Sequence, residues 1–258
     1  MTRYSNERFY PSPSSLELVR RCASDLGPDD PTLDEWFQKY HRDHAIRIAH
    51  DLDFVARFCE RDTSIVEFGS VPLLLTAPLV SLGHDVTGVD IDPSRFSSAI
   101  SKIGAKVSKC DIENETLSFP DNTFDVSIFF ELFEHLRINP IFTLREIYRV
   151  LKPGGVLLIS TPNLRSLSGL NNFLLKNKCY SCSGDIYKEY EKLTKIGHMG
   201  HVREYTTLEV TEFLEKIGFS VEEIVFRGKY GDRFANGVVR LLPRLRPFSS
   251  FVARKGIS

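Results

Sequence analysis

Short runs of apolar residues alternate with segments of helical length between residues 62 and 163. The strand-like runs, among them IVEFG and DVTGVD, are rich in β-branched residues and end at a glycine or an acid. Parallel strands need a crossover of about a dozen residues or more between them, and this crossover is usually a helix. The alternation therefore predicts parallel βαβ units and an α/β fold with a doubly wound sheet.

The flanking segments predict how the rest of the chain is organised. Residues 31–60 repeat apolar positions at helical spacing and predict one or two helices, whereas the polar first 15 residues are expected to form a loose arm. Residues 164–203 interrupt the alternation for too long to be a simple connection, and we interpret them as an inserted cap. We expect an arm and helical extension over residues 1–60 and one domain over residues 61–258.

Local signals mark several helix ends. Pro93 can open a helix, because the N–H that proline lacks has no partner in the first turn. Thr206 and Glu209 have the spacing of a capping box, and Gly218 stands where that helix should end. The helical segment that contains TLREIYRVLKPGG should precede the fifth strand, VLLIST.

Composition limits the classes of protein to which the chain can belong. It is 42% hydrophobic and 26% charged over 258 residues, which is typical of a protein with a sizeable core. A formal net charge of −1 provides no overall field that would attract nucleic acid. The first residues contain no secretory h-region, no run of 18 apolar residues occurs, and the five cysteines are irregularly spaced. We therefore expect reduced thiols and a cytoplasmic protein.

Three strand ends carry residues that suit a nucleoside. Gly69 allows a sharp turn after the first strand, and Asp90 and Asp111 end the next two strand-like runs at intervals of 21 residues. In doubly wound folds, an acid about 20 positions after such a glycine can accept hydrogen bonds from both hydroxyls of a ribose. These residues predict a nucleoside pocket at the carboxyl edge of the sheet.

The ordered motifs VEFGS, VTGVDID, KCDIE, FDVSIFFELFEHL and LKPGGVLLISTPN resemble the class I S-adenosylmethionine-dependent methyltransferases over residues 62–163. The tail from 204 to 258 is similar to the last helix and strands of that family. The resemblance implies a Rossmann-like, seven-stranded sheet of order 3-2-1-4-5-7-6 with an antiparallel last strand. It also implies S-adenosylmethionine as the cofactor, with Gly69 at its methionine end, Asp90 on the ribose and Asp111 beside the adenine. The cofactor-binding residues that we expect are Glu67, Gly69, Ser70, Pro72, Asp90, Ile91, Asp111, Ile112 and Phe129.

The first loop departs from the family pattern. Where the family usually has GxGxG, Val71 and Leu73 occupy the second and third glycine positions, so a stiffer and bulkier loop is expected. A dinucleotide pyrophosphate needs the second glycine for close approach, which argues against a dehydrogenase. A non-catalytic homologue that only binds the cofactor remains an alternative.

The motif Glu131-x-x-Glu134-His135 follows the fourth strand. On a helix or turn these positions share one face, and a divalent cation would remove the repulsion between two grouped carboxylates. Oxygen-rich ligand sets with one imidazole suit Mg²⁺ or Mn²⁺. The motif resembles that of metal-dependent O-methyltransferases with a downstream histidine, which implies His201 as the fourth ligand and His198 as a general base or supporting group. Both histidines are our catalytic candidates. Without a metal, the acid would cap a helix and His135 would pack locally.

Three other features remain open. Cys179 and Cys182 could form a zinc site with His198 and His201, or be two incidental thiols. Residues 40–44 could line the substrate pocket or form a solvated helix face. Residues 240–248 mix arginine with leucine and could touch a membrane surface or simply join the last two strands.

These features predict an S-adenosylmethionine-dependent O-methyltransferase assisted by Mg²⁺ or Mn²⁺. Because a cation can chelate two neighbouring oxygens, a saccharide or glycan hydroxyl is the expected acceptor. The alternatives are the 3′-terminal ribose 2′-hydroxyl of RNA and a quinone or catechol precursor. No nucleic-acid partner is expected, since the chain contains no basic stripe interleaved with aromatic residues.

Overall fold

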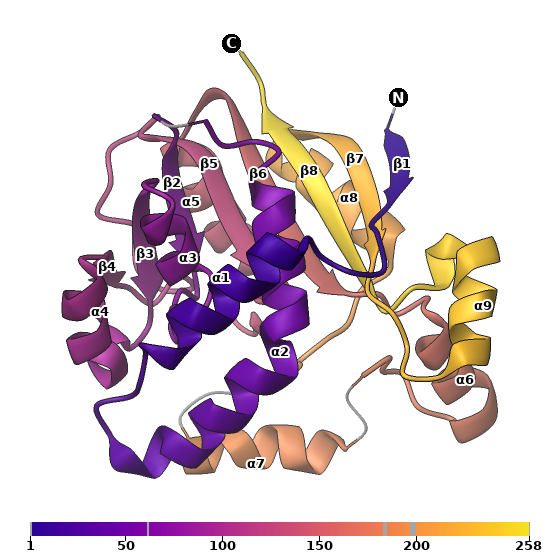
Figure 1. Ribbon diagram of the computed structural model, residues 1–258. Coiled ribbons are helices and arrows are strands. Elements are labelled where there is room, and N and C mark those ends of the chain that lie inside the picture. The colour runs from indigo at the N-terminus through magenta and orange to yellow at the C-terminus, as the bar shows by residue number, and fades with distance from the viewer. Residues whose placement is uncertain (1, 61, 183–184, 197–199, 258) are drawn as a thin grey trace. The chain divides into compact units, whose positions relative to one another are not determined.

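The structure is a computed structural model that describes residues 2–60, 62–182, 185–196 and 200–257. These residues form eight strands and nine α-helices (Figure 1). The strands are β1 (Arg3–Asn6), β2 (Ser64–Phe68), β3 (Asp85–Asp90), β4 (Lys106–Lys109), β5 (Phe124–Phe130), β6 (Leu151–Pro162), β7 (Phe219–Arg227) and β8 (Phe248–Lys255). The helices are α1 (Pro13–Ser24), α2 (Asp34–Val55), α3 (Thr76–Ser81), α4 (Ser97–Ile103), α5 (Pro140–Val150), α6 (Leu167–Lys176), α7 (Ile186–Ile196), α8 (Thr207–Ile217) and α9 (Arg233–Leu241).

The strands are hydrogen-bonded in the order β1-β7-β8-β6-β5-β2-β3-β4. Strand β2 pairs in parallel with β3 and β5, and β3 pairs in parallel with β4, as the βαβ pattern predicts. Strand β8 is antiparallel to β7. The sheet therefore has one strand more than the seven expected, and the additional strand is β1.

Strand β1 corrects the expectation of a loose N-terminal arm. It pairs in parallel with β7, where the ring of Tyr4 stacks on Phe226 at a centroid distance of 6.2 Å. Arg3 forms an ion pair of 2.8 Å with Glu223 of the same strand. The sequence RYSN has no alternating apolar pattern that would predict a strand. Pairing with β7, which is distant in the sequence, stabilises its extended conformation.

The chain divides into two compact units, and strands β5 and β6 contribute residues to both. Unit 1 comprises Met1–Phe9, Phe129–Tyr148 and Leu157–Ser258, and unit 2 comprises Tyr10–Ile128 and Arg149–Val156. The division that we expected at residue 60 stays a prediction.

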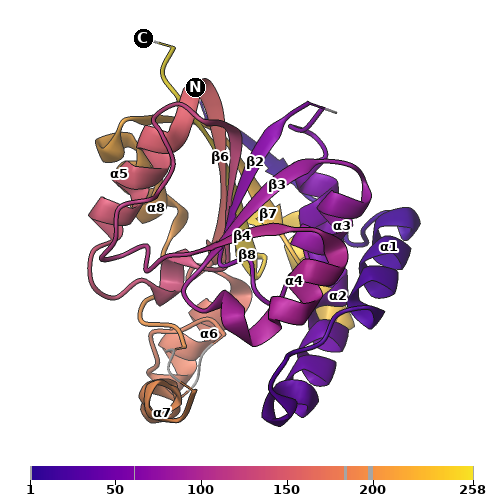
Figure 2. The same ribbon diagram turned by 90° about the vertical axis from the view of Figure 1, so that its left-hand side faces the viewer.

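Unit 2 contains the parallel strands that precede the predicted nucleoside-binding loops. Figure 2 shows α1, α2 and α3 on one side of its strands β2, β3 and β4. Helix α2 confirms the helical pattern of residues 31–60 and buries Phe37, whose ring meets Phe96 at 5.5 Å. Buried β-branched residues such as Val66 and Val89 make the strand interiors apolar, so polar side chains gather where the strands end.

Two helix boundaries differ from expectation. Pro93 opens a 3₁₀ turn, Pro93–Phe96, and the α-helix begins only at Ser97. Helix α5 ends at Val150, and the segment LKPGG already belongs to β6. The residue before a proline avoids the helical conformation, so the approach to Pro153 favours an extended backbone.

Unit 1 contains the expected cap segment, in which the structure has helices α6 and α7, and the C-terminal elements. The capping box of Thr206 and Glu209 at the start of α8 is confirmed, and Gly218 ends that helix as predicted. Helix α8 packs against β7. No helix among the described residues has the length and apolar character needed to cross a membrane.

The capping box gives a test of this part of the fold. We expect Thr206→Ala to lower the free energy of unfolding by about 1 kcal/mol, because the N–H of Glu209 loses its acceptor. The matched control is Thr211→Ala, which removes a hydroxyl that bonds only to Thr207 O in the same helix; it should change stability by less than about 0.5 kcal/mol. Denaturant unfolding measures both, and equal losses would contradict a specific role for the cap.

Candidate functional site

The turn after β2 brings the first two predicted cofactor loops of unit 2 together. Gly69 adopts a left-handed conformation with φ of 67°, and its N–H donates to Val89 O of strand β3 at 2.8 Å. The N–H of Ser70 donates to the same carbonyl at 3.3 Å. The backbone thus turns sharply at the carboxyl end of the strand, as the glycine predicted.

Asp90 lies at the end of β3 and supports this turn. One carboxylate oxygen accepts from the N–H of Val71 and the other from the N–H of Asp92, both at 3.0 Å. Arg95 lies 3.7 Å from the second oxygen. Burial raises the pKa of Asp90 above its ordinary value, and the hydrogen bonds and Arg95 oppose that rise. An acid held in this way retains lone pairs for a further donor.

Glu67 is a buried acid on β2, two residues before Gly69. The hydroxyl of Thr76, the first residue of α3, donates to its carboxylate at 2.6 Å. Burial raises the pKa of Glu67 to about 8, although the Thr76 hydrogen bond lowers it. Near neutral pH, a large share of the molecules therefore carry a protonated Glu67.

The other predicted cofactor residues have varied surroundings. Asp111 accepts hydrogen bonds within its own turn, from the N–H of Glu113 at 3.1 Å and from Asn114 at 2.8 Å. Among the other expected cofactor-binding residues, Ser70 and Phe129 are buried, whereas Pro72 and Ile112 are half-buried. Ile91 is exposed. Phe129 belongs to unit 1, whereas the others belong to unit 2.

The end of strand β6 orients the two acids of the ELFEH motif in unit 1. The hydroxyl of Ser160 donates to Glu131 at 2.7 Å, and that of Thr161 donates to Glu134 at 3.0 Å. Glu131 has a φ of 50°, so it lies outside the short 3₁₀ helix Phe133–His135. The motif is therefore not one continuous helical turn, and the face shared by all three predicted ligands does not form.

Both described histidines of this region have their Nδ1 atoms fixed. Nδ1 of His135 lies 3.0 Å from Gly200 O, which can only accept, so Nδ1 carries the hydrogen. Nδ1 of His201 lies 3.2 Å from Glu204, whose ionised carboxylate also only accepts. In a neutral His201 ring the lone pair is therefore on Nε2, and this atom lies 4.0 Å from the Glu134 carboxylate. Anchoring of the second ring nitrogen in this way is typical of metal-binding histidines.

Three of the four predicted metal ligands come together. Donor atoms of Glu134, His135 and His201 lie within 4.8 Å of one another. Donors on opposite sides of a Mg²⁺ ion are about 4 Å apart, so small side-chain movements would let this set hold a divalent cation. Glu131 does not belong to this group of described residues. The other catalytic candidate, His198, lies outside the described residues, and its role stays a prediction.

Glu204 is a functional candidate that the sequence reasoning missed. It accepts from the N–H of Ser181 at 2.6 Å and also from the Ser181 hydroxyl, the Cys182 thiol and His201. Burial alone would raise the pKa of Glu204, yet these hydrogen bonds lower it to about 2. The spacing His201-x-x-Glu204 was the available signal, but the contact with Ser181 joins residues that are 23 positions apart in the sequence.

The zinc alternative finds only partial support in the geometry. Cys182, His201 and Glu204 form a second close group, with the Cys182 sulfur 3.5 Å from Nδ1 of His201. Burial and the Glu204 carboxylate raise the pKa of the Cys182 thiol, which favours the neutral form. Cys179 belongs to neither group of described residues.

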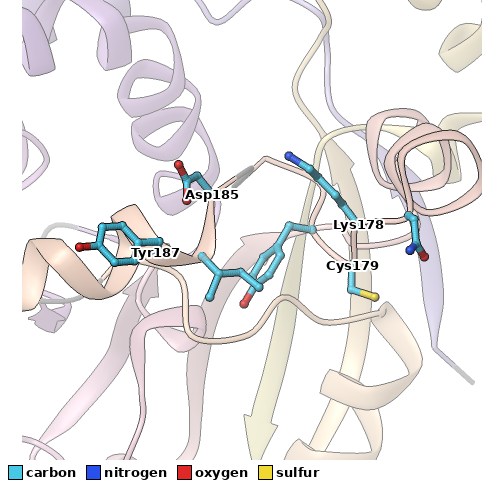
Figure 3. Close-up of a pocket in the computed structure, with 7 residues that line it drawn as sticks. Lys178, Cys179, Asp185 and Tyr187 are labelled. Atoms are coloured by element: carbon cyan, nitrogen blue, oxygen red, sulfur yellow. The ribbon is translucent and has the colours of Figure 1, made fainter.

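A cavity of about 520 Å³ lies within the cap segment of unit 1. Figure 3 shows its lining side chains: Lys178 and Cys179 follow α6, Asp185 precedes α7, and Tyr187 lies in the first turn of α7. Its mixture of aromatic and charged groups could accept a polar ring. The pocket is open to solvent, and none of its lining residues belongs to the predicted cofactor, metal or catalytic set.

Comparison with known proteins identifies a methyltransferase domain in the chain. Residues 66–159 match the methyltransferase domain family. The match includes the Gly69 turn, Asp90 and the ELFEH motif.

Two curated relatives share part of the chain. A probable S-adenosylmethionine-dependent methyltransferase of Mycolicibacterium smegmatis is 31% identical over 160 residues, which cover 58% of this chain and 50% of the relative. A ubiquinone biosynthesis O-methyltransferase of Cereibacter sphaeroides is 27% identical over 139 residues, which cover 49% of this chain and 56% of the relative. The chain thus spans about half the length of these relatives.

Solved structures agree on the fold. A methyltransferase of Thermotoga maritima, described as S-adenosylmethionine-dependent and as a possible histamine N-methyltransferase, aligns with a TM-score of 0.56. The alignment covers 93% of this chain and 99% of that chain at 18% identity. The chain therefore has the Rossmann-like α/β fold of class I S-adenosylmethionine-dependent methyltransferases.

The raised pKa of Glu67 predicts a pH-dependent stability. Between the ordinary value of 4.5 and about 8, the folded state keeps a proton that the unfolded chain has lost, so the free energy of unfolding should fall as pH rises. The slope can reach about 1.4 kcal/mol per pH unit. We expect Glu67→Gln to remove this fall, and thermal unfolding from pH 4.5 to 8 measures it. The control Glu17→Gln changes an exposed acid of the same unit and should leave the slope unaltered; a wild-type slope equal to that of Glu67→Gln would contradict the prediction.

Proposed function

We propose that the protein is an S-adenosylmethionine-dependent O-methyltransferase assisted by a divalent cation. The observation that carries the proposal is the buried Asp90 beside the Gly69 turn, within a segment that matches a methyltransferase domain. The two histidines with fixed Nδ1 atoms support the part played by a cation.

The residues of unit 2 would hold the methyl donor. Asp90 accepts hydrogen bonds from the ribose hydroxyls, and the tight turn at Gly69 lets the backbone approach the donor closely. Glu67 is poised to bind an ammonium group, because a nearby positive charge favours its ionised form. When bound, S-adenosylmethionine supplies the electrophilic methyl group.

The residues of unit 1 would prepare the acceptor. Glu134, His135 and His201 would hold a cation with one carboxylate and two imidazoles, since their donor atoms lie within 4.8 Å of one another. Such a cation supplies Lewis-acid catalysis, which lowers the pKa of an acceptor hydroxyl. Glu204 holds the His201 ring so that Nε2 stays available. In a reaction without a cation, the same Nε2 could accept the proton of the acceptor hydroxyl.

The acceptor that we favour is a compound with two neighbouring oxygens, because these can share one cation. The expectation of a saccharide or glycan hydroxyl rests on this chemistry alone. The similarity to ubiquinone biosynthesis O-methyltransferases favours a catechol acceptor as the second candidate. Incubation with labelled S-adenosylmethionine and a panel of saccharides, catechols and RNA ends tests the proposal, and absence of transfer to every hydroxyl acceptor would contradict it.

Cofactor binding by Asp90 can be measured separately from turnover. We expect Asp90→Asn to weaken S-adenosylmethionine binding by at least about 10-fold, since the variant loses charged acceptor oxygens. Isothermal titration calorimetry gives the affinity. The control is Asp85→Asn at the other end of β3, which makes the same charge change at an exposed ion pair with Lys106. Equal affinities of the two variants would argue against Asp90 as the ribose ligand.

Cation dependence is the second test. We expect chelator treatment to abolish turnover and added Mg²⁺ or Mn²⁺ to restore it. Glu134→Gln and His135→Ala should each weaken Mn²⁺ binding by more than about 10-fold, measured by calorimetry without substrate. The control Glu212→Gln alters an exposed acid on α8 and should bind Mn²⁺ like the wild type. Turnover that survives the chelator would instead leave the Nε2 atom of His201 as a general base.

A further inference from the structure

Helix α9 presents an exposed face that the proposed reaction does not use. Phe234 is 82% exposed and Leu241 is 84% exposed. They are seven residues apart, which is two helical turns, so they lie on the same side of the helix. The opposite side carries Val239, which is fully buried within unit 1. Leu242 follows the helix and is also exposed.

Arginines border these apolar side chains. Arg233 and Arg240 are also two turns apart and flank Phe234 and Leu241, and both are exposed. The guanidinium of Arg240 lies 5.0 Å from the ring centre of Phe9. This cation–π contact does not neutralise the positive charge of Arg240.

The charge of this region differs from that of the chain. Residues 228–248 contain five basic residues and one acid, whereas the whole chain has a net charge of −1. The single acid, Asp232, caps α9 and accepts from the N–H of Ala235 at 2.8 Å. Arg246 is buried, so four basic residues that are not buried stand against one acid, and this segment carries an excess of positive charge on a protein that is close to neutral.

We propose that the α9 face, made of Arg233, Phe234, Arg240, Leu241 and Leu242, binds the surface of an anionic lipid bilayer. Phenylalanine and leucine can enter the boundary between headgroups and acyl chains, and arginine forms hydrogen bonds with lipid phosphates. Three apolar side chains give only a small apolar contribution. Binding therefore needs the arginines and is reversible and sensitive to salt.

The charges also argue against a second copy of the chain as the occupant. In a two-fold dimer the same patch faces itself, so Arg233 and Arg240 of one copy would meet the same residues of the other. A stable dimer interface also buries about 800 Å² on each partner, well beyond three apolar side chains and their rim. A negatively charged surface is the complementary partner.

Vesicle sedimentation tests the proposal with the full chain and without S-adenosylmethionine, so its outcome is independent of methyl transfer. We expect binding to vesicles that contain phosphatidylglycerol, little binding to pure phosphatidylcholine, and release at high salt. Phe234→Ser and Leu241→Ser should each lower the partition coefficient by about 10-fold. Arg233→Gln should lower it by about fivefold. These side chains are exposed, so the variants should fold, which circular dichroism checks.

The matched controls lie near the start of β7 and the end of β8, away from α9. Ile257→Ser removes an apolar side chain that is 86% exposed, and Lys216→Gln removes an exposed positive charge. Figure 1 shows the C-terminus and α9 at opposite ends of β8. Both controls should bind vesicles like the wild type.

Three results would overturn the proposal. The first is the absence of binding to anionic vesicles at low salt. The second is an equal loss of binding in the controls and the α9 variants. The third is a dimer in light scattering that Leu241→Ser dissociates while no vesicles bind, because a second copy would then cover the face.

Discussion

Buried carboxylates are the constraint on which both candidate sites depend. An ionised carboxylate loses its hydration when it is buried, so it needs donors, a cation or a proton. Glu204 is held ionised by hydrogen bonds from Ser181, Cys182 and His201. Asp90 receives two backbone N–H groups and lies near Arg95. Glu67 receives one hydroxyl, and burial raises its pKa to about 8. The three acids thus satisfy the same constraint in three ways, and each way suits a different task.

The task of Glu204 is to fix geometry. An acid with so many donors binds no further ligand easily, but it sets which nitrogen of His201 carries the hydrogen. Gly200 O does the same for His135. The two rings thus lie close together, with centroids 5.0 Å apart, and each has an acceptor near its Nδ1 atom. This arrangement also explains why the cap segment matters, since Ser181 and Cys182 connect it to the acid beside His201.

Local patterns predicted the parts of the fold that depend on neighbours in sequence. The βαβ alternation, the Thr206 capping box and the Gly69 turn each follow from a few adjacent residues, and the structure contains them. Features that depend on distant contacts could not be predicted. Strand β1 exists through its pairing with β7, more than 200 residues away in sequence. A single helix or turn over Glu131–His135 would have placed all three ligands on one face, but Glu131, with φ of 50°, lies before the 3₁₀ helix Phe133–His135 and outside it.

The first loop lacks two glycines that are usual in such a loop, and a glycine on the neighbouring strand provides part of the space that the loop needs. Leu73 stands where a glycine is usual, and it adopts a φ of 69° while fully buried. A left-handed backbone costs such a residue about 1–2 kcal/mol, and burying a leucine side chain contributes a similar amount. Gly88 on β3 leaves room for the Ser70 side chain of this loop, because an added Cβ at Gly88 would lie 2.5 Å from the Ser70 hydroxyl. The loop therefore keeps its tight turn with bulkier side chains, because the neighbouring strand makes room for it.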